Sequence, residues 1–220
     1  MKIIFLLFIL FYSSSFAQSP NSKDLDKKIV ISVLGDSLSS GYGLPENTGF
    51  SPILEKYMKK NGIDVIIVDD SIDGNTSEKA LRQIYNVSST RPDLVILQLG
   101  AGDIIQGVDP KDMFENLNYI IQQLNEQGIV VLLTGIKLPD THPNSQTYKD
   151  LYDLLAIKNE IHLYPFFMKG VALKPEFNLS DGMHPNVKGV DVIVNNIGPF
   201  VIMVSNEIIN IKNQLNIKKK

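Results

Sequence analysis

The 220-residue chain contains no cysteine and no tryptophan, and it has only three histidines. Without cysteine there is neither a disulfide framework nor a thiol for lipid attachment. Three histidines with no H-E-x-x-H spacing offer no ligand set for zinc, so we expect neither a metal nor another cofactor. Excess charge is also lacking, because 21 basic and 24 acidic side chains give a net charge of −3. Since nucleic-acid binding requires a basic face, this balance does not favour it.

Long apolar runs are absent apart from one at the N-terminus. It spans Ile3 to Tyr12 and is preceded by the positively charged Lys2. That stretch is about half as long as the ~20 residues of a membrane-spanning helix, which argues against the alternative of a membrane anchor. A small-x-small site ends at Ala17. Residues 1–17 are therefore predicted to be a Sec-type signal peptide cleaved near Ala17, which places the protein in the periplasm or outside a bacterium.

The two ends of the mature chain are polar. Residues 18–27 are predicted to be a polar linker, and residues 216–220, with the sequence "NIKKK", a basic C-terminal tail. Terminal lysines are typical of a solvated chain end, and transient contact with anionic lipid is the alternative. Nothing in the sequence specifies an oligomeric state.

Five short runs rich in β-branched residues alternate with helical patterns between these ends. Because each run is nearly continuously apolar, it is typical of a strand buried on both faces of a parallel sheet. The pattern predicts a single α/β domain over residues 28–215, with a five-stranded parallel sheet between two helical layers. The runs are "KIVISVLG", "DVIIVDDS", "DLVILQLG", "IVVLLTGI" and "IHLYPFF", and the expected helices span 51–62, 77–85, 110–128 and about 187–215, the last interrupted at Gly198-Pro199.

In a sheet of this kind, ligands bind at the carboxyl ends of the strands. Ser37 follows the first predicted strand, but its surroundings match neither the G-x-S-x-G elbow nor a dinucleotide fingerprint. Asp181 and His184 lie three residues apart near the C-terminus. A serine nucleophile needs a base, and the base needs a group that orients it, so His184 and Asp181 suit these two roles. The alternative is that Ser37 and Asp181 cap helices and that His184 is an ordinary surface residue.

Three motifs together, "VLGDSLSSGYG", "SIDGNTS" and "DGMHPN", resemble the GDSL or SGNH hydrolases, and most closely their bacterial periplasmic thioesterase, lysophospholipase and arylesterase branch. The resemblance extends from about Lys28 to Phe200. It implies a flavodoxin-like SGNH hydrolase fold and a catalytic triad in which Ser37 is the nucleophile, His184 the general base and Asp181 the residue that orients the base.

The resemblance also implies an oxyanion hole made by the backbone N–H groups of Ser37 and Gly74 and by an asparagine side chain in a G-x-N-D block. This chain has Gly102 at the asparagine position, within Gly100–Asp103. Loss of one such donor costs on the order of 10²–10³ in turnover. Replacement of the donor by the Asn75 side chain, or by a water in the room left at Gly102, is an alternative to a weakened enzyme. If a donor is simply missing, Gly102→Asn should raise turnover.

Apolar residues on the predicted strand-to-helix loops favour an acyl substrate over a sugar. The candidates for substrate binding are Ile104, Ile105, Leu138 and Pro139. We therefore expect a serine esterase or thioesterase that acts on small-molecule acyl esters or lipids such as lysophospholipids. The alternatives are a carbohydrate or peptidoglycan O-deacetylase with the same triad, and an inactive ligand-binding homologue.

Overall fold

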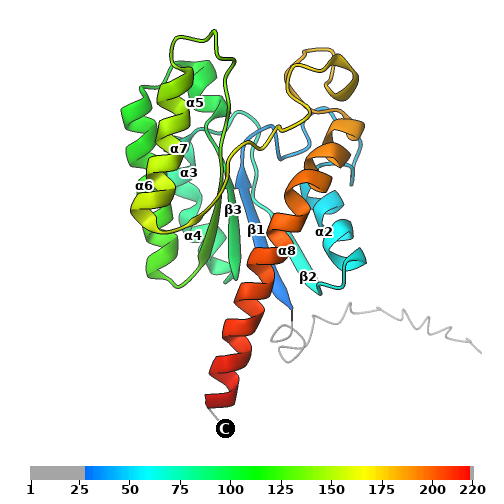
Figure 1. Cartoon of the computed structure of the whole chain (residues 1–220), viewed down its shortest axis with the longest axis vertical. Helices are drawn as coiled ribbons and strands as arrows, with labels where there is room; N and C mark the ends of the chain where they lie inside the picture. The colour runs from blue at the N-terminus through cyan, green and yellow to red at the C-terminus, as the bar shows by residue number, and fades with distance from the viewer. Residues whose placement is uncertain (1–27, 219–220) are drawn as a thin grey trace, which may run out of the picture.

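The computed structural model describes residues 28–218 and contains a five-stranded parallel sheet with strand order β2-β1-β3-β4-β5. The predicted signal peptide and the linker of residues 18–27 lie outside the described residues. The α/β fold class is thus confirmed, and the strands lie within the five predicted runs (Figure 1). The strands are β1 (Ile29–Gly35), β2 (Val65–Asp69), β3 (Leu94–Gln98), β4 (Val130–Thr134) and β5 (His162–Tyr164).

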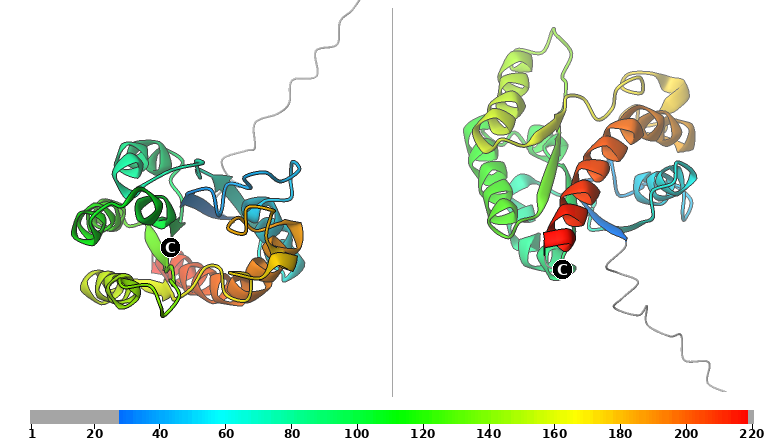
Figure 2. Two further views of the ribbon diagram at one scale, coloured as in Figure 1. Left: turned by 90° about the horizontal axis from the view of Figure 1, so that it is seen from above. Right: turned by 60° about the horizontal axis from the view of Figure 1, so that its bottom comes forward.

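Helices cover both faces of this sheet (Figures 1 and 2). Helices α2 and α8 pack on one face, and α3, α4, α6 and α7 pack on the other. Strand β3 shows why its sequence is apolar without interruption: Leu94 and Ile96 belong to one core, whereas Val95 and Leu97 belong to the other. The helices are α2 (Phe50–Lys60), α3 (Ser77–Ala80), α4 (Ile84–Ser89), α5 (Ala101–Gln106), α6 (Pro110–Glu126), α7 (Ser145–Asn159) and α8 (Val187–Lys218), with 3₁₀ turns η1 (Leu81–Gln83) and η2 (Pro175–Phe177).

Helix α8 continues through Pro199 to Lys218, so the predicted interruption at Gly198-Pro199 is wrong. The predicted boundary at residue 215 also falls inside this helix. A proline removes one helical hydrogen bond, but residues on both sides of Pro199, such as Ile197 and Val201, are fully buried against the sheet and keep the helix intact. Gly198 lets α2 approach closely, because a Cβ there would lie 2.4 Å from the Tyr57 ring.

Two helices were not expected from the sequence. Helix α7 has Tyr148, Leu151, Tyr152 and Leu155 buried on one side, which is a helical spacing that the sequence already displays. Helix α5 covers most of the stretch "GAGDIIQG", which was expected to be a loop. Six residues that begin with alanine and glycine carry little helical signal of their own, so tertiary contacts decide this helix.

Candidate active site

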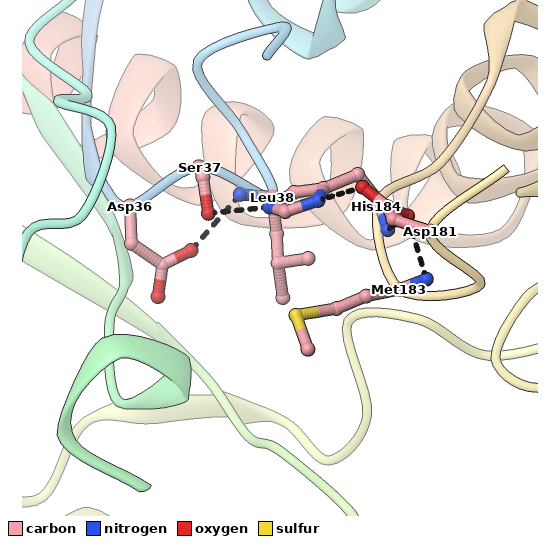
Figure 3. A network of polar contacts seen from close by, with 6 residues as sticks. All are labelled: Asp36, Ser37, Leu38, Asp181, Met183 and His184. Atoms are coloured by element: carbon pink, nitrogen blue, oxygen red, sulfur yellow. Dashed lines mark hydrogen bonds and ion pairs between the residues drawn. The ribbon is translucent and has the colours of Figure 1, made fainter. Parts of the chain in front are cut away.

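The carboxyl edge of the sheet brings together Ser37, His184 and Asp181 (Figure 3). His184 Nε2 lies 2.9 Å from Ser37 Oγ, and His184 Nδ1 lies 2.7 Å from Asp181 Oδ2. Because a carboxylate can only accept, the proton is assigned to Nδ1, and Nε2 accepts from the serine hydroxyl. This tautomer can take a proton from Ser37 Oγ, which is the arrangement required of a serine nucleophile and its base.

Ser37 is fixed by the residue before it. Asp36, which directly follows β1, is 1% exposed. Its carboxylate accepts from the backbone N–H of Leu38 (3.0 Å) and of Ala101 (3.2 Å), so it ties the serine turn to α5. Burial raises the pKa of Asp36 to about 6, against the lowering effect of these hydrogen bonds and of the Gln98 side chain. No role of this carboxyl was predicted from the sequence.

The loop that carries Asp181 and His184 is held mainly by its own hydrogen bonds. Asp181 Oδ1 accepts from the backbone N–H of Met183 at 2.8 Å and of His184 at 3.0 Å. These two bonds, together with the His184 side chain, lower the pKa of Asp181 to about 2, the Met183 bond being the largest cause. The Tyr42 ring lies against the imidazole, with 4.4 Å between ring centroids. Asp181 is therefore ionised at neutral pH and His184 is held on two sides.

Two backbone N–H groups near Ser37 remain available for an oxyanion. Among residues 28–218, neither the Ser37 N–H nor the Gly74 N–H donates to another protein group. Gly74 is exposed in the turn after β2, where its φ is +69°. Both N–H groups are thus free to donate, and their roles in an oxyanion hole stay predictions.

The absence of a side chain at Gly102 leaves no empty space for a water molecule, so the alternative of a water donor at this position is wrong. A Cβ at Gly102 would lie 2.0 Å from the backbone oxygen of Asn75, so that carbonyl occupies the position of a side chain. The Asn75 side chain is no replacement donor either. It is 1% exposed, and its Nδ2 donates to the Gly35 carbonyl at 3.1 Å. A glycine is required at position 102 because two backbone segments meet there.

The buried carboxylate of Asp103 explains this close approach. Its oxygens accept from the backbone N–H of Ser77 at 2.9 Å and from the Ser77 hydroxyl at 2.5 Å. The same hydroxyl accepts from Asn116 Nδ2 on α6 at 3.1 Å. Asp103 therefore clamps the start of α3 onto α5, which draws the turn containing Gly74 and Asn75 toward Ser37.

A cavity of about 530 Å³ adjoins the Ser37–His184 pair and is lined mainly by apolar side chains. Leu38 and Met183, the sequence neighbours of the pair, both line it, and Figure 3 shows their side chains on one side of the pair. All four predicted substrate residues line the cavity, although Ile104 and Ile105 lie on α5 rather than in a loop. The lining residues not predicted include Ile136, Phe166, Met168, Ala172 and Leu173.

The two remaining histidines lie apart from this arrangement. His142 Nδ1 accepts from the Asn144 N–H within a turn, and His162 pairs with Glu207 at 3.0 Å. Within the part of the chain that the structure describes, no group of three or more His, Asp or Glu side chains is placed to hold a metal ion.

A serine and histidine in hydrogen-bond contact beside an apolar cavity, at the carboxyl edge of a parallel sheet, define a hydrolase site on an α/β scaffold. The sequence profile of the GDSL-like lipase/acylhydrolase family matches residues 33–192. The chain belongs to this family, as the resemblance implied, and it is a hydrolase that acts on ester bonds.

Three related proteins illustrate the similarity. An arylesterase of Vibrio mimicus is 33% identical over 82% of this chain and 88% of its own length. The thioesterase 1/protease 1/lysophospholipase L1 of Escherichia coli K12 is 32% identical over 70% of this chain and 74% of its own length. The psychrotrophic esterase EstA from Pseudoalteromonas sp., whose crystal structure was solved inhibited by monoethylphosphonate, is 28% identical with a TM-score of 0.75, covering 80% of this chain and 98% of that one.

Proposed function

We propose that this protein is a serine esterase or thioesterase that works through an acyl-enzyme. The Ser37 hydroxyl attacks the acyl carbonyl and gives its proton to His184 Nε2, while Asp181 accepts from Nδ1 and stabilises the imidazolium. Collapse of the tetrahedral intermediate breaks the bond to the alcohol or thiol, which leaves with the proton from His184. Water then attacks the acyl-enzyme by the same route and releases the carboxylic acid. The 2.9 Å contact between Ser37 Oγ and His184 Nε2 carries this proposal.

The oxyanion is stabilised by two backbone donors, Ser37 N–H and Gly74 N–H. Gly102 supplies no side-chain donor, and the N–H groups of Ala101 and Gly102 serve the Asp36 carboxylate instead. An absent donor lowers turnover by on the order of 10²–10³ relative to a site with three. We therefore infer an enzyme that is slower than family members with the asparagine.

The acyl part of the substrate occupies the cavity of about 530 Å³. Its apolar lining, with Leu38 at the serine end, suits a hydrocarbon chain better than a sugar. Lysophospholipids and small aryl or alkyl esters are the substrates that combine an acyl chain with a leaving group outside this cavity. The O-deacetylase and binding-protein alternatives are tested by the assay below.

The test is hydrolysis of p-nitrophenyl esters of increasing chain length, and of a lysophospholipid, by the wild type and Ser37→Ala. The variant should lose at least on the order of 10⁴-fold in kcat. The matched control is Ser89→Ala at the far end of α4, an exposed hydroxyl that bonds only to the Asn86 carbonyl and should leave turnover unchanged.

Turnover that does not depend on Ser37 would contradict the nucleophile assignment. Activity confined to acetyl esters of carbohydrates would favour the deacetylase, and binding of acyl esters without turnover would identify an inactive homologue. A preference for medium or long acyl chains would support the cavity as the acyl site.

We further propose that residues 1–17 direct export and are removed near Ala17, so that the enzyme acts in the periplasm or outside the cell. The lysine followed by the apolar stretch of residues 3–12 supports this. Mass spectrometry of the exported protein reports the cleavage point.

A further inference from the structure

The last turns of α8 project beyond the amino ends of the strands, at the end of the molecule opposite the candidate active site (Figures 1 and 2). We call residues 208–218 the α8 overhang. Ile208, Ile211 and Leu215 are spaced for one side of a helix. Ile208 is buried, but Ile211 and Leu215 are 55% and 53% exposed. The apolar stripe of α8 therefore continues beyond the part of the helix that packs on the core.

This stripe lines a cleft of about 600 Å³ at the amino edge of the sheet. Pro92 and Ile129, at the starts of β3 and β4, form part of its other wall. The stripe is therefore only partly covered by the protein itself. Ile217, on another side of the overhang, is 74% exposed.

Basic residues line the cleft beside the stripe or follow the stripe in the sequence. Arg91 and Lys212 line the same cleft, and the chain ends in Lys218, Lys219 and Lys220. Two carboxylates at this end have partners, because Asp93 pairs with Lys212 at 2.6 Å and a Glu207 oxygen lies 3.0 Å from His162 Nε2. Residues 208–220 contain four lysines and no acidic side chain, whereas the whole chain has a net charge of −3.

Length decides how such a helix can meet a lipid bilayer. By composition and length, the stretch Val187–Leu215 could cross a membrane, but 44% of its most apolar window is buried inside the protein. Its buried residues, such as Ile197 and Val201, belong to the core. The overhang alone extends roughly 16 Å at 1.5 Å per residue, about half of the ~30 Å hydrocarbon core, so it can lie on a bilayer but not span it.

We propose that the α8 overhang docks this protein on an anionic phospholipid surface. Ile211, Leu215 and Ile217 enter the interface, and the lysines and Arg91 contact lipid phosphates. Apolar side chains combined with a basic cluster are the two signals that stable interfacial binding requires. A second copy of the chain fits less well, because two overhangs would bring like charges together. The docked protein holds its candidate active site away from the bilayer, and this proposal does not depend on the proposed function.

The test measures co-sedimentation of the protein, as recovered after export, with phosphatidylcholine vesicles that contain either no phosphatidylglycerol or about one third of it. The wild type should bind the anionic vesicles at least about ten-fold more tightly, and high salt should weaken this binding. Ile211→Ser/Leu215→Ser should weaken it by about ten-fold or more, since apolar area no longer leaves water. Lys219→Glu/Lys220→Glu should also weaken binding by about ten-fold or more, while the residues of helix α8 stay unchanged.

Two variants serve as matched controls, and all proteins share the same N-terminus. Leu154→Ser removes a leucine on α7 that is 56% exposed, close to the value for Ile211. Lys56→Glu/Lys188→Glu makes the same change of net charge on exposed lysines away from the overhang. Both controls should bind like the wild type, and hydrolysis of a soluble ester should be unchanged in every variant.

Three results would overturn the proposal. Equal binding to neutral and anionic vesicles removes the electrostatic part, and unchanged binding of both overhang variants assigns binding to another segment. A dimer that the overhang variants dissociate, without lipid binding by the wild type, would show that a second copy covers the stripe instead. Analytical ultracentrifugation of the same samples measures that outcome.

Discussion

The carboxyl and amino edges of the same sheet differ in how their charged groups are satisfied. At the carboxyl edge, the carboxylates of Asp36 and Asp103 are buried and bonded to backbone N–H groups of neighbouring segments. At the amino edge, Asp93 also accepts from a backbone N–H, that of Val30, but it pairs with the partly exposed Lys212. Glu207 contacts the His162 ring, and apolar side chains of α8 are half-exposed there. The first edge is a rigid frame around a hydroxyl and an imidazole, and the second is an open surface.

This difference indicates that chemistry and attachment are separated along the strands. Buried charge is costly unless it is hydrogen-bonded, so the frame at the carboxyl edge tolerates little change. Partly exposed ion pairs and half-exposed apolar residues contribute less to stability, so the last turns of α8 can change with small effect on the fold. Substitutions at the two edges should therefore affect different measurements.

The largest effect is expected from Asp181→Asn. The amide cannot accept both backbone bonds and the Nδ1–H bond as a carboxylate does, so His184 loses the group that fixes its tautomer. We expect kcat to fall by on the order of 10³–10⁴, as for the comparable change in serine proteases. Vesicle binding should not change. Because the pKa of Asp181 is held at about 2, its protonation should not appear in a pH–rate profile above about pH 4. An Asp181→Asn enzyme with near wild-type kcat would remove Asp181 from the triad.

Gly102→Asn is expected to have the next largest effect, and its direction reverses the expectation from the sequence. A Cβ at this position meets the Asn75 carbonyl at 2.0 Å, so the turn that carries Gly74 must shift. We expect the free energy of unfolding to fall by about 1–3 kcal/mol and kcat to fall rather than rise. Gly102→Ala should show the same direction without an added donor. Higher turnover in a stable Gly102→Asn protein would show that the turn adapts and that the new amide restores the missing donor.

The last prediction concerns the pH dependence of stability at Asp36. Its pKa is 3.8 in the unfolded chain and about 6 in the fold, so between these values the folded protein holds a proton that the unfolded chain has lost. The stabilisation from this proton is complete at low pH and is lost as pH rises through 6, a loss of about 3 kcal/mol at most.

Urea unfolding of the wild type and Asp36→Asn from pH 4 to 8 measures this loss, since asparagine cannot ionise and the variant lacks that part of the slope. Parallel pH dependences of the two proteins would show that Asp36 titrates normally.

The five strands and most of the helices were predictable because their signals are local. Continuous apolar runs, the cap at Asp109 and the proline after it are properties of short segments. The break wrongly predicted in α8 and the missed helix α5 share a cause. Pro199 and the residues after Gly100 behave against their local preference because burial on the sheet and the Asp103–Ser77 bonds outweigh it.

The residues of the candidate site also fall into those that the sequence predicts and those that only tertiary contacts place. Ser37, Asp181 and His184 could be found from residue type and motif order, and their assigned roles stay predictions. The hydrogen bonds of Asp36 and Asp103 to backbone N–H groups could not be predicted, because the sequence does not distinguish a buried carboxylate from an exposed one. The four apolar residues expected near the substrate do share one cavity, but the lining residues within 166–173 were not assigned to it from the sequence.

The sequence by itself determined the class of fold, the order of the elements and the residue types available for chemistry, since periodicity and composition are carried by neighbouring residues. Only the tertiary structure decided what Gly102 means. Its missing side chain is not empty space, because a carboxylate on one loop draws the backbone of another loop into that position. Contacts between segments far apart in the chain also decided at which residue the apolar stripe of α8 stops being buried in the core and becomes exposed.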